Sequence, residues 1–137
     1  MTAAELAALS ARAYRHMHPW TEADFAEALN RPETLLVAVD GAFALGRVVL
    51  DEAEILALAT DPDRQRSGQG SAALAQFETR AAARGAARIL LEVAAPNAPA
   101  CAFYQARGYT QAGRRKSYYA SPEGGRADAL LMTKALA

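Results

Sequence analysis

The spacing of hydrophobic residues changes several times along the chain, and each change predicts a different element. Apolar residues recur at helical intervals over residues 3–17, which predicts a first helix. A second helix is expected to begin at Thr21, because Thr21 and Asp24 have the spacing of a capping box. It should continue to about Leu29, since Pro32 disfavours helix just before it.

Three strand-like runs follow the two helices. They are Thr34–Val39, Ala42–Leu50 and Glu54–Thr60, each bounded by turn-forming residues. Asp40-Gly41 is a strong signal for a two-residue hairpin between the first two runs. The three runs therefore predict an antiparallel meander, with Gly46 as a candidate β-bulge.

The second half of the chain alternates between helical and strand-like segments. The predicted elements are a helix over about 70–84, a strand at Ala87–Val93, a short helix from Asn97 to about Arg107, and strands at Tyr109–Lys116 and Ala129–Thr133. Because the strand at 87–93 is almost continuously apolar, we expect both of its faces to be covered. The order ααβββαβαββ predicts a single α/β domain over residues 1–137, with a mixed sheet and one parallel crossover.

Composition and charge narrow the functional classes. The 137 residues are 52% hydrophobic, which suits one globular domain. The 15 basic and 15 acidic residues cancel, so the basic excess of a nucleic-acid-binding protein is missing. One cysteine cannot form an internal disulfide, and no apolar run reaches the ~20 residues that span a bilayer. We therefore expect a cytoplasmic protein with no nucleic-acid or membrane partner, and the N-terminus lacks the features of a signal peptide.

A polar, glycine-rich turn joins the third strand to the long helix. Its residues are Gln65, Arg66, Ser67, Gly68, Gln69, Gly70 and Ser71. The first turn of a helix leaves backbone N–H groups unpaired, and these groups bind anions, phosphates above all. The turn is therefore a predicted phosphate site.

Pattern alone leaves several interpretations of this turn. A nucleotide-triphosphate loop needs a lysine after its last glycine, where this chain has Ser71. The stretch from Gly68 to Ala73 fits the dinucleotide fingerprint G-x-G-x-x-A, with Glu92 roughly 20 residues beyond. Against it, Asp61–Ser67 separates the first glycine from the strand, whereas that fingerprint follows a strand directly. A plain glycine-containing loop is the third possibility.

The turn also resembles the Q/R-x-x-G-x-G/A motif of the GNAT acetyltransferases. Three residues occupy its defined positions: Gln65, Gly68 and Gly70. Three more match the N-x-x-A-x-x-x-Y pattern of the family's last core helix: Asn97, Ala100 and Tyr104. The resemblance implies the GNAT fold, a mixed and mostly antiparallel sheet flanked by helices.

Within that superfamily, the chain most resembles the bacterial ribosomal-protein-alanine N-acetyltransferases, from about residue 14 to its end. The similar segments are Pro19–Glu22, Val49–Ala53, Leu90–Val93, Arg115–Tyr119 and Gly125–Ala129. Members of this family usually begin with a short strand before the first helix, and this chain starts at or inside that helix. We therefore expect the family's first strand to be missing, which leaves a sheet edge that something must cover.

The resemblance implies acetyl-CoA as co-substrate and no metal. Backbone N–H groups from Gln65 to Ser71 would hold its diphosphate. The strand edge formed by Leu58, Ala59 and Thr60 would pair with the pantetheine arm, and the Ala59 N–H would polarise the thioester oxygen. Asn97 would contact the carrier near its reacting end.

Glu92 stands inside an otherwise apolar strand. Burial of a carboxylate is costly, and desolvation raises its pKa toward the range of a general base. The alternative is a glutamate that is paired with a neighbouring arginine or faces solvent. The resemblance assigns the matching glutamate as the base, directly or through water.

Tyr104 and Cys101 lie on the same short predicted helix. A tyrosine on an apolar helix face is often part of the core, whereas the resemblance assigns Tyr104 as the general acid that protonates the leaving thiolate. Cys101 could suggest an acyl-cysteine intermediate, but no histidine is placed to activate it, and we interpret it as an inert, buried thiol. His16 and His18 lack the neighbours of a metal site.

The resemblance implies that the acceptor is the N-terminal α-amino group of a protein, an alanine of a small-subunit ribosomal protein. An α-amino group, with pKa ~8, loses its proton more easily than lysine, with pKa ~10.4. Trp20, Tyr118 and Tyr119 are the predicted substrate-binding residues, and Arg114–Lys116 is either a solvated strand end or part of the substrate mouth. We expect a monomer or a weak dimer.

Two other functions stay open. A GNAT enzyme that acetylates a small amine, such as a polyamine or an aminoglycoside, could use an acidic pocket formed by Asp51, Glu52 and Glu54. A non-catalytic CoA-binding module would keep the fold without turnover, although Glu92 and Tyr104 argue against it.

Overall fold

The computed structural model describes residues 1–13, 19–64, 68–120 and 124–136. Its elements in chain order are α1 (Ala3–Ala13), α2 (Glu22–Leu29), β1 (Thr34–Val39), β2 (Ala42–Val49), β3 (Glu52–Thr60), a 3₁₀ turn (Pro62–Arg64), α3 (Gln69–Ala83), β4 (Arg88–Ala94), α4 (Ala98–Ala106), β5 (Thr110–Ala120) and β6 (Arg126–Ala135). The predicted order of helices and strands is confirmed, and so is the capping box of α2. The 3₁₀ turn was not predicted, and residues 14–17 of the first predicted helix lie outside the described residues.

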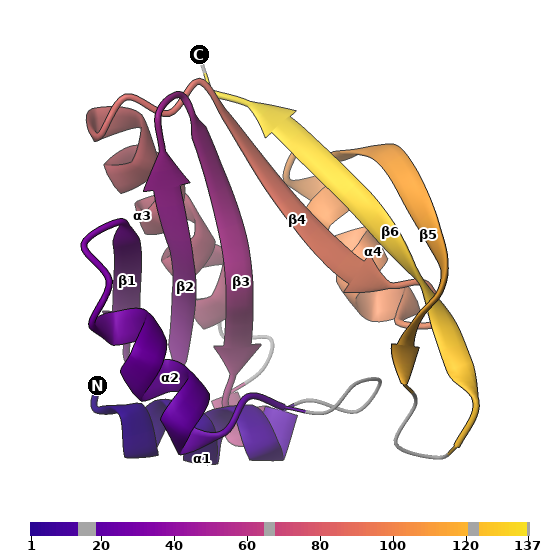
Figure 1. The fold of residues 1–137 in the computed structure, drawn as a ribbon, viewed down its shortest axis with the longest axis horizontal. Helices are drawn as coiled ribbons and strands as arrows, with labels where there is room; N and C mark the ends of the chain where they lie inside the picture. The colour runs from indigo at the N-terminus through magenta and orange to yellow at the C-terminus, as the bar shows by residue number, and fades with distance from the viewer. Residues whose placement is uncertain (14–18, 65–67, 121–123, 137) are drawn as a thin grey trace.

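The strands form one mixed sheet in the order β1-β2-β3-β4-β6-β5. Every pairing is antiparallel except that of β3 with β4, which confirms the single parallel crossover. Helices α1 and α2 cover one face of the sheet, here called the front face, and α3 and α4 cover the back (Figure 1). Among the described residues no strand precedes α1, and β1 forms an edge of the sheet.

Two hydrophobic cores hold these layers together. The front core joins α1 and α2 to the sheet through Leu6, Leu9, Phe25, Ala28, Phe43, Leu45, Ala57 and Ala59. The back core is larger and packs α3 and α4 against the sheet, with Phe77, Leu91, Val93, Tyr104 and Tyr109 among its members. No helix in the described part of the chain is long and apolar enough to cross a membrane.

A bulge in β3 moves its side chains from one core to the other. Leu45 of β2 pairs with Ala57, and the next residue, Gly46, pairs with Ile55, so Leu56 is an extra residue in β3. Before the bulge Ile55 packs in the back core, and after it Ala57 packs in the front core. The predicted bulge is therefore confirmed at Gly46, although the extra residue belongs to β3.

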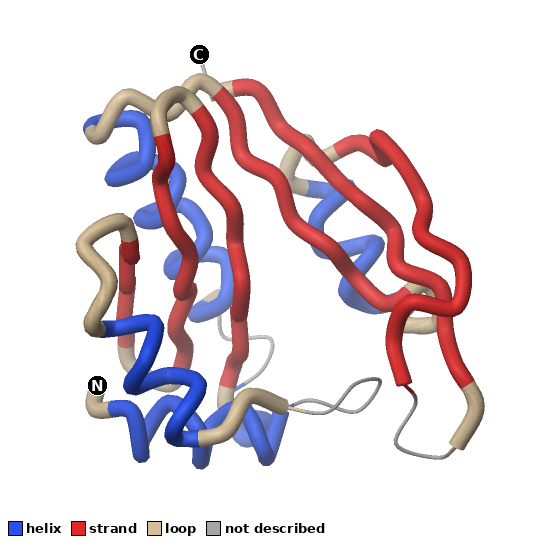
Figure 2. Tube along the Cα trace, in the orientation of Figure 1, coloured by secondary structure: helices blue, strands red, loops and turns tan. Residues whose placement is uncertain are grey.

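Strands β3 and β4 separate just beyond the bulge. Their pairing covers only Glu52–Ile55 against Arg88–Leu91. Figure 2 shows the two strands side by side at one end and far apart at the other. The facing edges, Leu56–Thr60 and Glu92–Ala94, therefore have no strand partner among the described residues.

Strand β4 departs from the prediction on one point. Its burial alternates, with Ile89, Leu91 and Val93 buried and with Leu90 and Glu92 only half-buried. The expectation that both faces of this strand are covered is wrong, because α1 and α2 pack over β1–β3 and leave the front of β4 partly open.

Gly46 provides a test of the bulge. A Cβ at this position would collide with the carbonyl oxygen of Glu54 and lie 2.6 Å from Cζ of Phe77. We expect Gly46→Ala to lower the free energy of unfolding by about 3 kcal/mol or more in urea titrations, because backbone and a core ring cannot both move aside.

Gly113→Ala is the matched control, because a Cβ there would meet only Leu131 at an ordinary 3.7 Å. Its effect should stay within about 1 kcal/mol. Equal effects of the two substitutions would contradict the packing described at the bulge.

Candidate active site

Helix α3 begins without a side-chain cap. Gly68 precedes it in a left-handed conformation, with φ 84°, and its carbonyl accepts the N–H of Ala72 at 3.0 Å. The amides of Gln69, Gly70 and Ser71 precede this first helical bond, and no side chain among the described residues caps them. These three amides form the described part of the predicted phosphate site, while Gln65, Arg66 and Ser67 lie outside the described residues.

Gly70 lets the start of α3 approach the end of β3. A Cβ on Gly70 would lie 2.8 Å from Oγ1 of Thr60, closer than such atoms pack. The unpaired amides of the helix therefore lie next to the unpaired strand edge that contains Leu58, Ala59 and Thr60.

Arg107 adds a cation to this place that the sequence motifs do not indicate. Its guanidinium stacks 3.8 Å from the ring centre of Phe103, and its Nε donates to Oγ of Ser71 at 3.1 Å. A cation beside a helix N-terminus is electrostatically unfavourable unless an anion lies with it. The only sequence signal for this residue was an arginine four positions after an aromatic residue on one helix.

Asn97 caps α4, as predicted. Its Oδ1 accepts the N–H of Ala100 at 3.2 Å. The cap fixes the start of the helix that carries Tyr104, whereas the contact of Asn97 with a carrier stays a prediction.

Glu92 lies on the front side of β4, opposite the buried Leu91 and Val93. Its side chain is 18% exposed, and its Oε1 lies 3.5 Å from Nη2 of Arg115 on β5. The sequence left open whether Glu92 is paired with an arginine, and the structure shows such a pair. Because Arg115 is itself 56% exposed, solvent reaches this pair from the arginine side.

Tyr104 lies on the opposite side of the sheet. It is 8% exposed and meets Phe103 and Tyr109 edge-on, with ring centres 5.2 and 5.6 Å apart. The two predicted catalytic residues therefore come from opposite faces, with Glu92 in front and Tyr104 in the back core.

Tyr109 has a separate hydrogen-bond network. Its hydroxyl donates to Oε2 of Glu78 at 2.8 Å, and Nζ of Lys134 lies 3.0 Å from Oε1 of the same carboxylate. Burial, with the bond to Glu78, raises the pKa of Tyr109 far above that of a free phenol. Tyr109 therefore stays protonated and holds α3 against the end of α4.

The predicted substrate residues lie on the front of the molecule and at the β5–β6 end. Trp20 packs against Phe25 with ring centres 5.2 Å apart. Tyr118 is 45% exposed, and the guanidinium of Arg115 lies 5.0 Å from its ring centre. Arg115 thus connects Tyr118 to Glu92, a link that the sequence did not reveal. The backbone of Tyr119 pairs with Ala127, and its side chain is outside the description.

A protrusion of β5 presents Tyr118. Arg115 pairs with Ala129 and Tyr119 with Ala127, so three residues of β5 lie opposite Asp128 alone. Asp128 accepts the Ser117 N–H at 2.8 Å and Nε of Arg114 at 2.7 Å, and these bonds lower the pKa of its carboxyl. Arg126 holds the protrusion as well, since it donates to the carbonyl oxygens of Ser117 at 2.7 Å and Tyr118 at 3.2 Å.

The remaining candidate residues give little support to other chemistry. Cys101 is half-buried against the back core, so it is less enclosed than expected. Of the acidic residues considered for a polyamine pocket, Glu52 is paired with Arg88 and Glu54 with Arg47. His16 and His18 lie outside the described residues, and the described part of the chain contains no group of three metal-ligating side chains.

Two parallel strands that separate beside an uncapped helix leave room for an extended carrier to lie in the sheet as an additional strand. This is the arrangement in which the resemblance to acyl-transferring enzymes predicts the carrier, with its phosphates at the start of α3.

Comparison with known proteins supports this class. The model of the Acetyltransferase (GNAT) family matches residues 3–109, and the chain belongs to this family. The predicted GNAT fold is confirmed, and the protein is an acetyltransferase. Membership also removes the dinucleotide interpretation of the glycine-rich turn.

Individual relatives are close. The [Ribosomal protein bS18]-alanine N-acetyltransferase of Escherichia coli K12 is 42% identical over 123 residues, which cover 85% of this chain and 81% of that protein. The crystal structure of the ribosomal-protein-S18-alanine N-acetyltransferase from Escherichia coli superposes with a TM-score of 0.83 at 38% identity, over 96% of this chain and 85% of that one. Chaetomium thermophilum Naa20, crystallised with a bisubstrate analogue, shares the fold with a TM-score of 0.81 at 20% identity, over 96% and 81%.

The Tyr109 network predicts a pH dependence of stability. Above pH ~10 the unfolded chain loses the phenol proton, whereas the folded protein, with its raised pKa, keeps it. The free energy of unfolding should therefore fall as pH rises above 10, and Tyr109→Phe should reduce the slope by up to about 1.4 kcal/mol per pH unit.

Urea titrations between pH 9 and 11 measure this slope. The same substitution at Tyr118 is the control, because Tyr118 is 45% exposed whereas Tyr109 is buried. An unchanged slope in Tyr109→Phe would show that the folded protein also loses this proton.

Proposed function

We propose that this protein transfers the acetyl group of acetyl-CoA to the N-terminal α-amino group of a protein, an alanine of a small-subunit ribosomal protein. The observation that carries the proposal is the 42% identity to a bS18-alanine N-acetyltransferase over most of both chains. Since ribosomal proteins are made in the cytoplasm, the proposal assigns this enzyme to the same compartment.

The chain has suitable groups for the carrier. The amides of Gln69–Ser71 and the guanidinium of Arg107 would hold the diphosphate, together with the motif residues Gln65–Ser67. The pantetheine arm carries amide groups, which would pair with the open edge at Leu58–Thr60 as a neighbouring strand does. An N–H of this edge, that of Ala59, would polarise the thioester oxygen, and Asn97 would lie near the reacting end.

Acetyl transfer then needs three proton movements. The α-ammonium of the acceptor would give one proton to Glu92, directly or through water, and the neutral nitrogen would attack the thioester carbon. As the carbon–sulfur bond breaks, Tyr104 would protonate the leaving thiolate, and the cationic nitrogen would lose a second proton, which restores Tyr104 through water. Glu92 releases its proton to solvent, so the net reaction forms the amide, the free thiol and one proton. A carrier lying along the unpaired edge of β4 would have Glu92 on its front side and Tyr104 behind it, which suits an amine that enters from the front.

An α-amino acceptor makes this chemistry easier than a lysine does. Its pKa of ~8 means that neutralising it at pH 7 costs about 1.4 kcal/mol, against roughly 4.6 for lysine. One carboxylate is then a sufficient base, and holding the amine next to the thioester supplies much of the remaining acceleration.

The role of Glu92 predicts a specific kinetic defect. Glu92→Gln should lower kcat for an N-terminal alanine peptide by at least about 100-fold, since general bases contribute on this scale. Acetyl-CoA affinity, measured by calorimetry, should stay within twofold, because the phosphate site is untouched.

Glu52→Gln is the control, as it removes a carboxylate on the exposed side of β3 that is paired with Arg88. It should keep wild-type kinetics. A Glu92→Gln enzyme with normal turnover would remove Glu92 from the mechanism.

Tyr104 gives an independent prediction. Tyr104→Phe keeps the ring contacts with Phe103 and Tyr109 and removes only the hydroxyl, so kcat should fall by at least about tenfold. Tyr109→Phe, which removes the neighbouring hydroxyl, should lower stability and leave kcat near its wild-type value. The reverse pattern would exchange the roles of the two tyrosines.

The small-amine alternative is less well supported, because Glu52 and Glu54 are paired with arginines. Steady-state assays with an N-terminal alanine peptide and with spermidine separate the two acceptors. Mass spectrometry of the peptide after incubation with acetyl-CoA separates both enzymes from a non-catalytic CoA-binding module.

A further inference from the structure

We propose that the pocket between α2 and strands β1–β3 is a subsite for an arginine side chain of the acceptor protein, three to five residues after its reactive N-terminus. The inference rests on the proposed function and adds to it a second determinant of substrate choice, distant from the reacting atoms.

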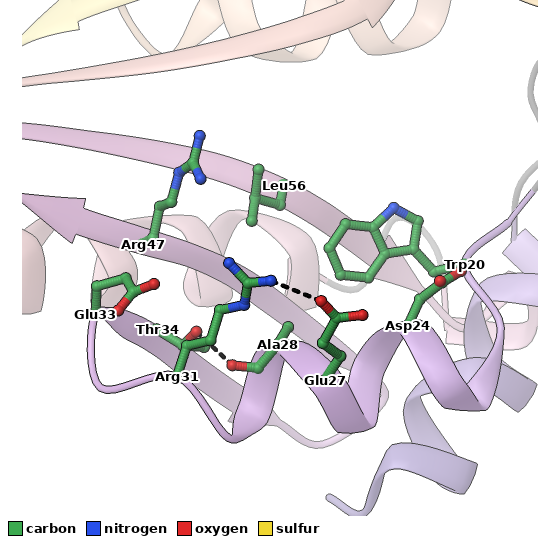
Figure 3. A pocket seen from close by; sticks show the side chains of 9 residues that line it. All are labelled: Trp20, Asp24, Glu27, Ala28, Arg31, Glu33, Thr34, Arg47 and Leu56. Atoms are coloured by element: carbon green, nitrogen blue, oxygen red, sulfur yellow. Dashed lines mark hydrogen bonds and ion pairs between the residues drawn. The ribbon is translucent and has the colours of Figure 1, made fainter.

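The pocket is a cavity of about 420 Å³ on the front of the molecule. Figure 3 shows its two walls, with Arg31 and Glu27 from the α2 side facing Arg47, Leu56 and Trp20. A cavity of this size holds one or two side chains, at the lower end of the range for small-ligand sites.

The pocket shares the front face of the sheet with Glu92. Thr34, Arg47 and Glu54 are cross-strand neighbours on β1, β2 and β3, and Glu54 is in register with Leu90 of β4. Cross-strand neighbours project from the same face, and so do residues two apart on one strand. Leu90 and Glu92 therefore lie on the same face as the pocket residues Thr34 and Arg47.

The separation suits a short stretch of peptide. Glu92 is on β4 and Arg47 is on β2, which is two strands away in the sheet. The distance between these strands is two spacings of about 4.8 Å, and the divergence of β3 from β4 adds to it. An extended chain advances about 3.3 Å per residue, so a peptide with its amine at Glu92 reaches the pocket at its third to fifth residue.

The apolar wall is fixed in place. Trp20 is tilted by 50° against Phe25, which belongs to the front core. Leu56 is the extra residue of the β3 bulge, and its side chain lines the pocket. The bulge therefore both separates β3 from β4 and places this apolar side chain in the pocket. A planar cation stacks well on an indole ring held in this way.

The charge of the pocket favours a cation. Its lining includes three carboxylates, those of Asp24, Glu27 and Glu33, and two guanidiniums. Both guanidiniums are paired, Arg31 with Glu27 at 2.6 Å and Arg47 with Glu54 at 2.6 Å. Asp24 and Glu33 therefore remain as excess negative charge.

A cationic ligand can replace Arg31 as the partner of Glu27 at little energetic cost. Its side chains are 54% and 69% exposed, and exposed pairs of this spacing contribute about 0.5 kcal/mol or less. An incoming arginine can take the place of Arg31 at Glu27 while it stacks on Trp20. Arginine fits better than lysine, because its planar fork can pair with a carboxylate and stack at once.

Acceptor peptides test the proposal. The host is an octapeptide of one N-terminal alanine followed by glycine and serine, and a single arginine is placed at each position from two to seven. We expect arginine at one position between three and five to lower KM at least tenfold without changing kcat, because a distant subsite contributes uniform binding.

The double variant Glu27→Gln, Glu33→Gln should abolish this gain while the arginine-free host peptide is acetylated as before. Both side chains lie outside the capping box, so α2 stays capped. The matched control is Glu22→Gln, Glu52→Gln, which removes two carboxylates outside the pocket and should keep the full gain.

Trp20 supplies a readout that does not depend on turnover. It is the single tryptophan of the chain, so its fluorescence reports directly on the pocket. The preferred peptide should change its emission in the wild type, and tenfold more peptide should be needed in the double variant.

The outcomes distinguish the subsite assignment from the proposed function. If the host peptide is acetylated and arginine has no position-dependent effect, or if the gain survives in the double variant, the subsite assignment is overturned. If no peptide is acetylated while acetyl-CoA still binds, the proposed function fails and the subsite assignment fails with it.

Discussion

The extra residue in β3 is the constraint on which the site depends. A parallel pair of strands has no reason to separate while both keep their register, and β3 and β4 are in register up to Ile55 and Leu91. The bulge at Leu56 rotates the rest of β3, so that its small residues Ala57 and Ala59 turn toward the front core. This rotation requires close approach of β2, β3 and α3, which Gly46 permits because it has no side chain.

The separated strands give the two sides of the site different chemistry. Behind the sheet, α3 and α4 supply backbone amides, a cation held on an aromatic ring and a tyrosine in a closed core. In front, charged side chains pair across strands and with solvent, as Glu92 does with Arg115. Under the proposed function, a phosphate-bearing carrier would occupy the first environment and a protein terminus the second, so the sheet would keep the two substrates apart until they meet at the opening.

Much of the fold could be predicted because its signals are local. The capping box of α2, the Asp40-Gly41 hairpin and the start of α3 each depend on residues that are neighbours in the chain. The protrusion opposite Asp128 lies between consecutive strands, but the sequence pattern does not reveal that three residues of β5 stand opposite one residue of β6. The Glu92–Arg115 pair could not be predicted, since it depends on the placement of β4 and β5, which are not consecutive strands. Arg107 was missed for the same reason, because its partner Ser71 is 36 residues away. Glu92 and Tyr104 were named from a family pattern, which records the outcome of such long-range contacts without explaining them.

The protrusion of β5 has an evolutionary consequence. Since three residues of β5 stand opposite Asp128 alone, additions or losses between Arg115 and Tyr119 need not shift the pairing of β6 with β4. If the protrusion contacts the acceptor, as the proposed function holds, those residues can diverge to suit a new acceptor while the carrier half of the enzyme stays intact. A fold built in this way can acquire new substrates by changing a few exposed positions, without rebuilding the machinery that delivers the acetyl group.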